Sequence, residues 1–148
     1  MKKTHEWDPE AGAAYCIIEY NNQKLGGYAS CHPDDLQFLS PLTGGYIAEC
    51  RADIKYYQHI KNNELYPQIK ALKHLLSIIK QNKNYNANSM EVKKLYKEIK
   101  IKEKELESVK ENIKEIKQQL SNYLETKEKL HKKIRLRELK KESMGDLV

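Results

Sequence analysis

Residues 92–137 read VKKLYKEIKIKEKELESVKENIKEIKQQLSNYLETKEKLHKKIRLR, and apolar residues recur there at alternating spacings of three and four. This period is typical of a coiled-coil seam, in which one side of a helix is apolar over many turns. Since an isolated helix cannot bury such a stripe, we expect other helices to cover it. The ladder drops at Lys102, Lys127 and Arg137 and otherwise consists of Val92, Leu95, Ile99, Leu106, Val109, Ile113, Ile116, Leu120, Tyr123, Leu130 and Ile134.

A shorter ladder of the same period lies upstream, in residues 65–79. It predicts a helical segment that packs on the long one. Pro67, shortly after Asn62-Asn63, predicts a break or kink, because proline removes one helical hydrogen bond and crowds the preceding turn. We therefore expect a kinked helix over residues 46–81.

The two ladders are separated by an asparagine-rich stretch, residues 82–88, which predicts a loop. Asn88, with Glu91 three residues later, is placed to cap a long helix over residues 89–141. Two ladders joined by so short a loop favour an antiparallel helical hairpin.

The long helix exceeds its expected partners in length. Residues 89–141 would span about 80 Å as one helix, whereas residues 66–81 would cover about 24 Å. Even with the preceding helical segment added, part of the seam stays uncovered. We expect a homodimer through residues of about 106–137, with back-folding or fraying as the alternatives.

The N-terminal region, residues 1–45, has the pattern of a small β structure. Residues 15–20 and 24–31 are predicted strands, joined by a tight turn at Asn21-Asn22. Residues 1–13 are expected to form an irregular lead-in from which Trp7 docks on the core. The predicted fold class is therefore α+β, predominantly α, with a small N-terminal β-hairpin followed by a long antiparallel helical hairpin or coiled coil.

A helix is also expected from Gly45 to about Lys61, capped by Thr43. The amide groups of Gly44-Gly45 at such a helix start would suit an anion, with Arg51 two turns later. No phosphate-binding glycine motif accompanies them, so this site is a minor alternative.

The net charge of +6 is unevenly distributed. Residues 1–88 hold 10 Lys and Arg against 9 Asp and Glu, whereas residues 127–142 hold 8 Lys and Arg against 3 Glu. This basic tip of the long helix is expected to bind a partner, either an acidic protein or the phosphate backbone of a nucleic acid along residues 127–141. The residues predicted to bind a partner are Lys129, Lys132, Lys133, Arg135, Arg137 and Lys140 at the tip, and the amphipathic side chains Tyr56, Tyr57 and Tyr66.

The sequence carries no recognisable catalytic or cofactor signature, so we expect a protein that is not an enzyme and needs no cofactor. Cys31, His32 and Asp34 are too close in sequence to form a catalytic triad readily. The three cysteines lack the close pair of a zinc knuckle and are expected to be reduced, partly buried thiols rather than a metal site. We expect no membrane span and no signal peptide, and hence a cytoplasmic protein.

Two segments carry a resemblance to a known group of proteins. Residues 28–35, YASCHPDD, and residues 44–52, GGYIAECRA, resemble a pattern in small phage and prophage proteins of Gram-positive bacteria, most of which lack an assigned activity. The resemblance covers residues of about 14–54. It implies a phage-related accessory protein whose motif positions are structural. Gly45 is expected to allow close packing where the chain enters the helix, Ala48 and Ala52 to allow tight packing on the hairpin, and Asp34 or Asp35 to pair with Arg51. The motif positions are Cys31, Pro33, Asp34, Asp35, Gly45, Ala48, Arg51 and Ala52.

Together these features predict a non-enzymatic phage-type protein that binds and blocks a host protein in the bacterial cytoplasm. A component of antiviral defence, such as a CRISPR effector, is the expected type of target. The alternative is a nucleic-acid-binding accessory protein that uses the basic tip.

Overall fold

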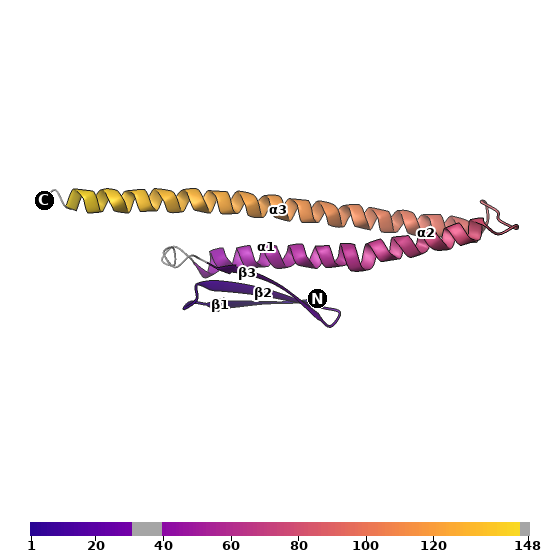
Figure 1. Ribbon diagram of the computed structural model, residues 1–148, viewed down its shortest axis with the longest axis horizontal. Coiled ribbons are helices and arrows are strands. Elements are labelled where there is room, and N and C mark those ends of the chain that lie inside the picture. Colours follow the sequence, from indigo (N-terminus) through magenta and orange to yellow (C-terminus); the bar gives the residue numbers. More distant parts are fainter. Residues whose placement is uncertain (31–39, 146–148) are drawn as a thin grey trace. The chain divides into compact units, whose positions relative to one another are not determined.

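A computed structural model describes residues 1–30 and 40–145. It has a small antiparallel sheet followed by long helices, which confirms the predicted α+β, mainly α class (Figure 1). Two compact units are formed, one by Met1–Ala52 with Ile116–Val148 (unit 1) and the other by Asp53–Glu115 (unit 2). The elements in chain order are β1 (Lys2–Asp8), β2 (Ala13–Tyr20), β3 (Gln23–Ser30), α1 (Pro41–His59), the π-helix η2 (Ile60–Leu65), α2 (Tyr66–Lys80) and α3 (Met90–Gly145).

The sheet has three strands, in the order β1-β2-β3. The prediction that residues 1–13 are irregular is wrong, because residues 2–8 pair with β2 along their whole length, from Lys2 opposite Glu19 to Asp8 opposite Ala13. The turn into β2 is held by Asp8, whose Oδ1 accepts hydrogen bonds from the following backbone amides at 3.1 and 3.2 Å.

The predicted β2–β3 hairpin is confirmed. Tyr20 pairs with Gln23 across the turn, and Asn21 and Asn22 have φ angles of 47° and 63°. Both values lie in the left-handed region, which asparagine tolerates better than most residues and which a two-residue hairpin turn of this kind requires. The Asn-Asn pair therefore sets the register of the hairpin.

One face of the sheet packs against α1. Buried small residues meet there: Cys16 on β2, and Ala48 and Ala52 on α1, all fully or almost fully excluded from solvent. At Gly27 on β3 the two backbones touch, because a Cβ atom there would lie 2.3 Å from the carbonyl oxygen of Ala48. The expectation that the two alanines allow tight packing on the hairpin is confirmed. The predicted buried thiols are confirmed for Cys16 and for Cys50 on α1, neither of which forms a disulfide bond.

Helix α1 begins earlier than predicted. Ser40 caps it, because the Ser40 Oγ accepts a hydrogen bond from the Thr43 amide at 3.1 Å. Pro41 occupies the first turn, where a missing N–H group costs nothing. Gly44 lies inside the helix and its amide donates to the Ser40 carbonyl at 3.0 Å. The predicted Thr43 cap and the anion site at Gly44-Gly45 are therefore wrong.

The predicted kink near Pro67 takes the form of a π-helix. Residues 60–65 adopt this wider turn, and Pro67 lies in the first turn of α2, where a proline is tolerated. The helical path therefore continues from α1 through η2 into α2 without a loop.

In unit 2, α2 and the first half of α3 form the predicted antiparallel helical hairpin. One cluster joins Leu76 to Val92, Leu95 and Ile99 near the loop, and a second joins Leu65 and Ile69 to Leu106 further along α3. The helix cap differs from the prediction: Ser89, not Asn88, accepts a hydrogen bond through its Oγ from the Val92 amide at 3.3 Å.

The apolar seam of α3 is buried over more of the helix than the lengths of its expected partner helices predicted. In unit 2, Leu106 and Ile113 are buried, and in unit 1 Leu120 is buried. Also in unit 1, the ring of Tyr123 packs on that of Tyr46 from α1 at a centroid distance of 4.5 Å. The first half of the predicted dimer contact, residues 106–123, is thus covered within the chain. The homodimer itself stays a prediction.

Candidate interaction surface on α3

Residues 124–140, in the C-terminal half of α3, combine exposed apolar and cationic side chains. Leu130, Leu136 and Leu139 are 46%, 58% and 59% exposed. Leu130 continues the seam, whereas Leu136 and Leu139 fall outside the ladder of three- and four-residue steps. We name residues 124–140 the α3 end segment.

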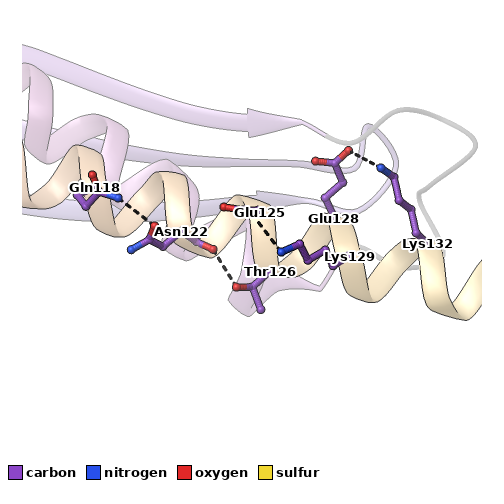
Figure 2. A network of polar contacts seen from close by, with 7 residues as sticks. All are labelled: Gln118, Asn122, Glu125, Thr126, Glu128, Lys129 and Lys132. Atoms are coloured by element: carbon purple, nitrogen blue, oxygen red, sulfur yellow. Dashed lines mark hydrogen bonds and ion pairs between the residues drawn. The ribbon is translucent and has the colours of Figure 1, made fainter.

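Two of the predicted binding cations are engaged within the helix. Lys129 pairs with Glu125 at 3.1 Å and Lys132 pairs with Glu128 at 3.3 Å, each one turn away (Figure 2). All four side chains are strongly exposed, so each pair contributes a few tenths of a kcal/mol at most, about 0.3–0.5. A partner with carboxylates could therefore displace these pairs at little cost.

The remaining cations of the α3 end segment are the ones available to a partner. Lys133, Arg137 and Lys140 are exposed, and none has an ion pair within the described part of the chain. The side chain of Arg135, which was also predicted to bind, lies outside the described residues. Lys127 occupies a position of the apolar seam. Its ammonium lies 5.4 Å from the Tyr123 ring centroid and makes a cation–π contact there.

The predicted tyrosine surface is largely internal packing. The rings of Tyr56 and Tyr57 contact each other at 5.3 Å and both are half-buried, and burial raises the pKa of Tyr56. Tyr66 is exposed, and the ammonium of Lys110 lies 5.7 Å from its ring centroid. Of these three residues, Tyr66 is the one that presents its ring to solvent.

A shallow groove of about 360 Å³ lies beside Tyr66 in unit 2. Its floor is formed by Ile69 and Leu106, and at one end Lys73 and Glu103 form an ion pair of 3.0 Å across α2 and α3. The groove is bounded by charges of both signs, Lys73 against Glu103 and Glu107.

Half of the motif positions of the phage-like pattern fall outside the described residues. Cys31, Pro33, Asp34 and Asp35 lie outside the described residues, as does any contact that they make. Arg51 donates a hydrogen bond to the backbone oxygen of Tyr28 at 2.7 Å and so ties α1 to β3. A Cβ atom on Gly45 would meet nothing within 4 Å, so the expectation that Gly45 is needed for close packing is wrong.

A polar cluster that sequence reasoning missed joins β1 to α1. Glu49 accepts a hydrogen bond from the Lys3 ammonium at 2.8 Å and lies 3.4 Å from the His5 ring. The Lys3 hydrogen bond holds the pKa of the Glu49 carboxyl below its ordinary value, although burial opposes it. The partners lie 46 and 44 residues apart, so no local pattern indicates them.

This cluster makes folding stability depend on pH. A carboxyl whose pKa is lowered by folding stabilises the protein above its unfolded pKa of about 4.3, and that contribution is lost as the pH falls through the folded pKa. We expect Glu49→Gln to lower the free energy of unfolding at neutral pH and to flatten its decline below about pH 5. Urea titrations at several pH values measure this, with the exposed Glu10→Gln as the matched control. Parallel pH profiles of wild type and Glu49→Gln would contradict it.

Within residues 1–30 and 40–145, no group of three or more His, Cys, Asp or Glu side chains is arranged to hold a metal ion. None of the helices in that part of the chain is long and apolar enough to cross a membrane. Comparisons with protein families, with curated proteins and with solved structures find no match. The charge and exposure of the surfaces are therefore the basis for a proposed function.

Proposed function

We propose that this chain is a non-enzymatic interaction protein that binds an acidic groove of a partner protein through the α3 end segment. The observation that carries the proposal is that Leu136 and Leu139, which are three residues apart and so share one face of the helix, are exposed beside available cations. A helix that lies in a groove buries its apolar side chains while its charges meet the rim. Both features of the segment are then used.

The exposed leucines favour a protein over a nucleic acid. A phosphate backbone would engage Lys133, Arg137 and Lys140 by releasing counterions, but it would leave the leucines in water. The segment also has no Phe, Tyr or Trp side chain on which single-stranded bases would stack. Nucleic acid remains the alternative, and the experiment below separates the two.

The charge also disfavours a second copy as the occupant of this surface. Residues 127–142 hold 8 Lys and Arg against 3 Glu, so two such segments side by side would place cations against cations. Like charges brought together at an interface destabilise it. An acidic partner of different sequence has the opposite effect.

The resemblance to phage and prophage proteins supports a particular kind of partner. A phage accessory protein without a catalytic set acts by binding, and we propose a host protein as its target and the inhibition of that protein as its effect. A component of antiviral defence of the CRISPR type is the target class we favour.

Affinity capture from a nuclease-treated lysate of a Gram-positive bacterium tests this proposal. We expect wild type to recover a specific acidic protein that Lys133→Glu/Arg137→Glu/Lys140→Glu loses. The matched control, Lys93→Glu/Lys94→Glu/Lys97→Glu, makes the same charge change at exposed positions near the start of α3 and should still bind. Leu136→Ser/Leu139→Ser should also lose the protein.

Three outcomes would count against the proposal. Equal recovery by all variants would place the contact elsewhere on the chain. Capture from an untreated lysate but not from the nuclease-treated one, together with retention on DNA or RNA that falls steeply with salt, would favour the nucleic-acid alternative. Loss in the triple variant but not in Leu136→Ser/Leu139→Ser would mean that the leucines do not contribute.

A further inference from the structure

β1 is an edge strand of the three-stranded sheet. In the described part of the chain it pairs with β2 alone, and all seven of its residues, Lys2–Asp8, follow one register without a bulge. Edge strands present a row of unpaired N–H and C=O groups to which another strand can be added. Proteins usually blunt such edges with bulges, prolines or charges, and β1 has charges but neither of the others.

The helix that covers the sheet leaves this edge accessible. α1 touches the sheet at Gly27 on β3, the opposite edge strand. From β1 the helix is reached by long side chains, Lys3 and His5, which extend to Glu49. The backbone of α1 therefore lies towards β3, and a strand can approach β1 in the plane of the sheet.

The charges of β1 are ordered along the strand. Its sequence is KKTHEWD, with cations in the first half and carboxylates in the second. An antiparallel second copy reverses this order, so Lys2 of each copy can face a carboxylate of the other. The charges that would repel a parallel or a random strand are thus complementary to a second copy of β1.

Geometry leaves few registers for such a pair. Under a two-fold axis normal to the sheet, residues on the same face oppose one another, so the axis passes through a residue position. An axis at Lys2 or Lys3 would oppose two lysines, and an axis at Glu6 or Asp8 would oppose two carboxylates. An axis at Trp7 would place Glu6 of one copy opposite Asp8 of the other. Thr4 and His5 remain as centres.

The centre at Thr4 uses the available carboxylate. It places Lys2 of one copy opposite Glu6 of the other, twice, and pairs the two Thr4 side chains. The centre at His5 would instead place Lys2 opposite Asp8, whose Oδ1 already accepts two hydrogen bonds from its own turn. Glu6 is exposed and has no ion pair within the described residues.

We propose that two copies of this chain pair through antiparallel β1 strands centred on Thr4, which joins the two sheets into one of six strands. This surface is distinct from the α3 end segment and does not depend on the proposed function. A single strand edge buries less than the roughly 1,200 Å² of a standard interface, so the dimer is weak and dissociates on dilution. It would present two partner-binding segments in one assembly.

Sedimentation equilibrium over a range of protein concentrations tests the register directly. We expect wild type to dimerise reversibly and both K2E and E6K to weaken the dimer by about tenfold, because each places two like-charged pairs at the interface. An equimolar mixture of K2E and E6K should recover dimerisation, since each glutamate then faces a lysine. E10K, the same charge change in the adjacent turn, should behave as wild type.

Circular dichroism of each variant shows whether it is folded. We expect E6K to disturb folding less than K2E, because Glu6 lies opposite the uncharged Tyr15 on β2. A wild type that is monomeric at every concentration would overturn the proposal. So would a dimer that E6K leaves intact, or a mixture of K2E and E6K no stronger than either alone. A dimer lost on changing Leu130 and Ile134 would assign it to α3 instead.

Discussion

Replacing Gly27 by alanine is expected to destabilise unit 1 by about 3 kcal/mol. The new Cβ atom would lie 2.3 Å from the Ala48 carbonyl oxygen and 2.4 Å from the Ala52 amide nitrogen. Both are backbone atoms of α1, so no side-chain rotation can relieve the contact. The helix must move away from the sheet, which opens the packing of Cys16 and the two alanines.

Urea unfolding followed by the fluorescence of Trp7 measures this effect, because Trp7 is the single tryptophan of the chain and lies on β1 in unit 1. Gly26→Ala is the matched control, since its Cβ would lie 3.9 Å from the nearest atom, the Cys16 carbonyl oxygen, at an ordinary contact distance. We expect that variant to equal or slightly exceed wild type, as alanine loses less backbone entropy than glycine. Equal destabilisation by both substitutions would mean that strand propensity, not the approach of α1, sets the cost.

Side-chain periodicity was sufficient to predict the elements with one buried face. The 3,4 spacing of α3 and the shorter ladder of α2 specify an antiparallel hairpin, because both stripes must be buried and the loop between them is short. The Asn21-Asn22 turn was predictable for a different reason, since few residue pairs tolerate two positive φ angles. These signals are local, and each has one physical solution.

β1 was not predictable in this way, because its pattern lacks apolar alternation. The face towards α1 carries Lys3, His5 and Trp7, and the first two are accommodated by Glu49 far along the chain. A strand specified by a distant carboxylate looks like a charged, irregular segment in the sequence.

The helix starts were misplaced for a related reason. Ser40-Pro41 reads equally well as the end of one element or as the cap and first residue of the next, and the structure uses it as a start. Ser89 similarly replaces the predicted Asn88, one residue away. Short polar caps recur in both stretches, so the choice depends on packing that sequence does not show.

Half of the candidate surface was visible in the sequence. The clustered cations could be recognised in the sequence, but counting charges could not show that Lys129 and Lys132 pair with glutamates of the same helix. The exposed Leu136 and Leu139 were missed because they do not follow the seam, and a ladder search passes over them. Their exposure emerges from the structure, and it is what shifts the balance towards a protein partner.

Replacing Leu106 by alanine is expected to destabilise unit 2 by about 2–3 kcal/mol. Leu106 is buried against Leu65 and Ile69, so truncation removes apolar contacts and leaves a cavity between the helices. The cost should fall at the lower end of the range for buried leucines, because Leu106 also forms the floor of the groove beside Tyr66 and water can enter the space left behind. Helical circular dichroism during urea unfolding measures the change.

Leu136→Ala provides the matched control, as the same substitution on the same helix at a side chain that is 58% exposed. It should change the free energy of unfolding by no more than about 0.5 kcal/mol. If Leu106→Ala were as mild as Leu136→Ala, α2 would not be the cover of the α3 seam at this level, and the stripe at Leu106 would need another surface. If Leu136→Ala were as costly as Leu106→Ala, the α3 end segment would already be buried in the isolated protein, and it could not serve as the partner-binding surface.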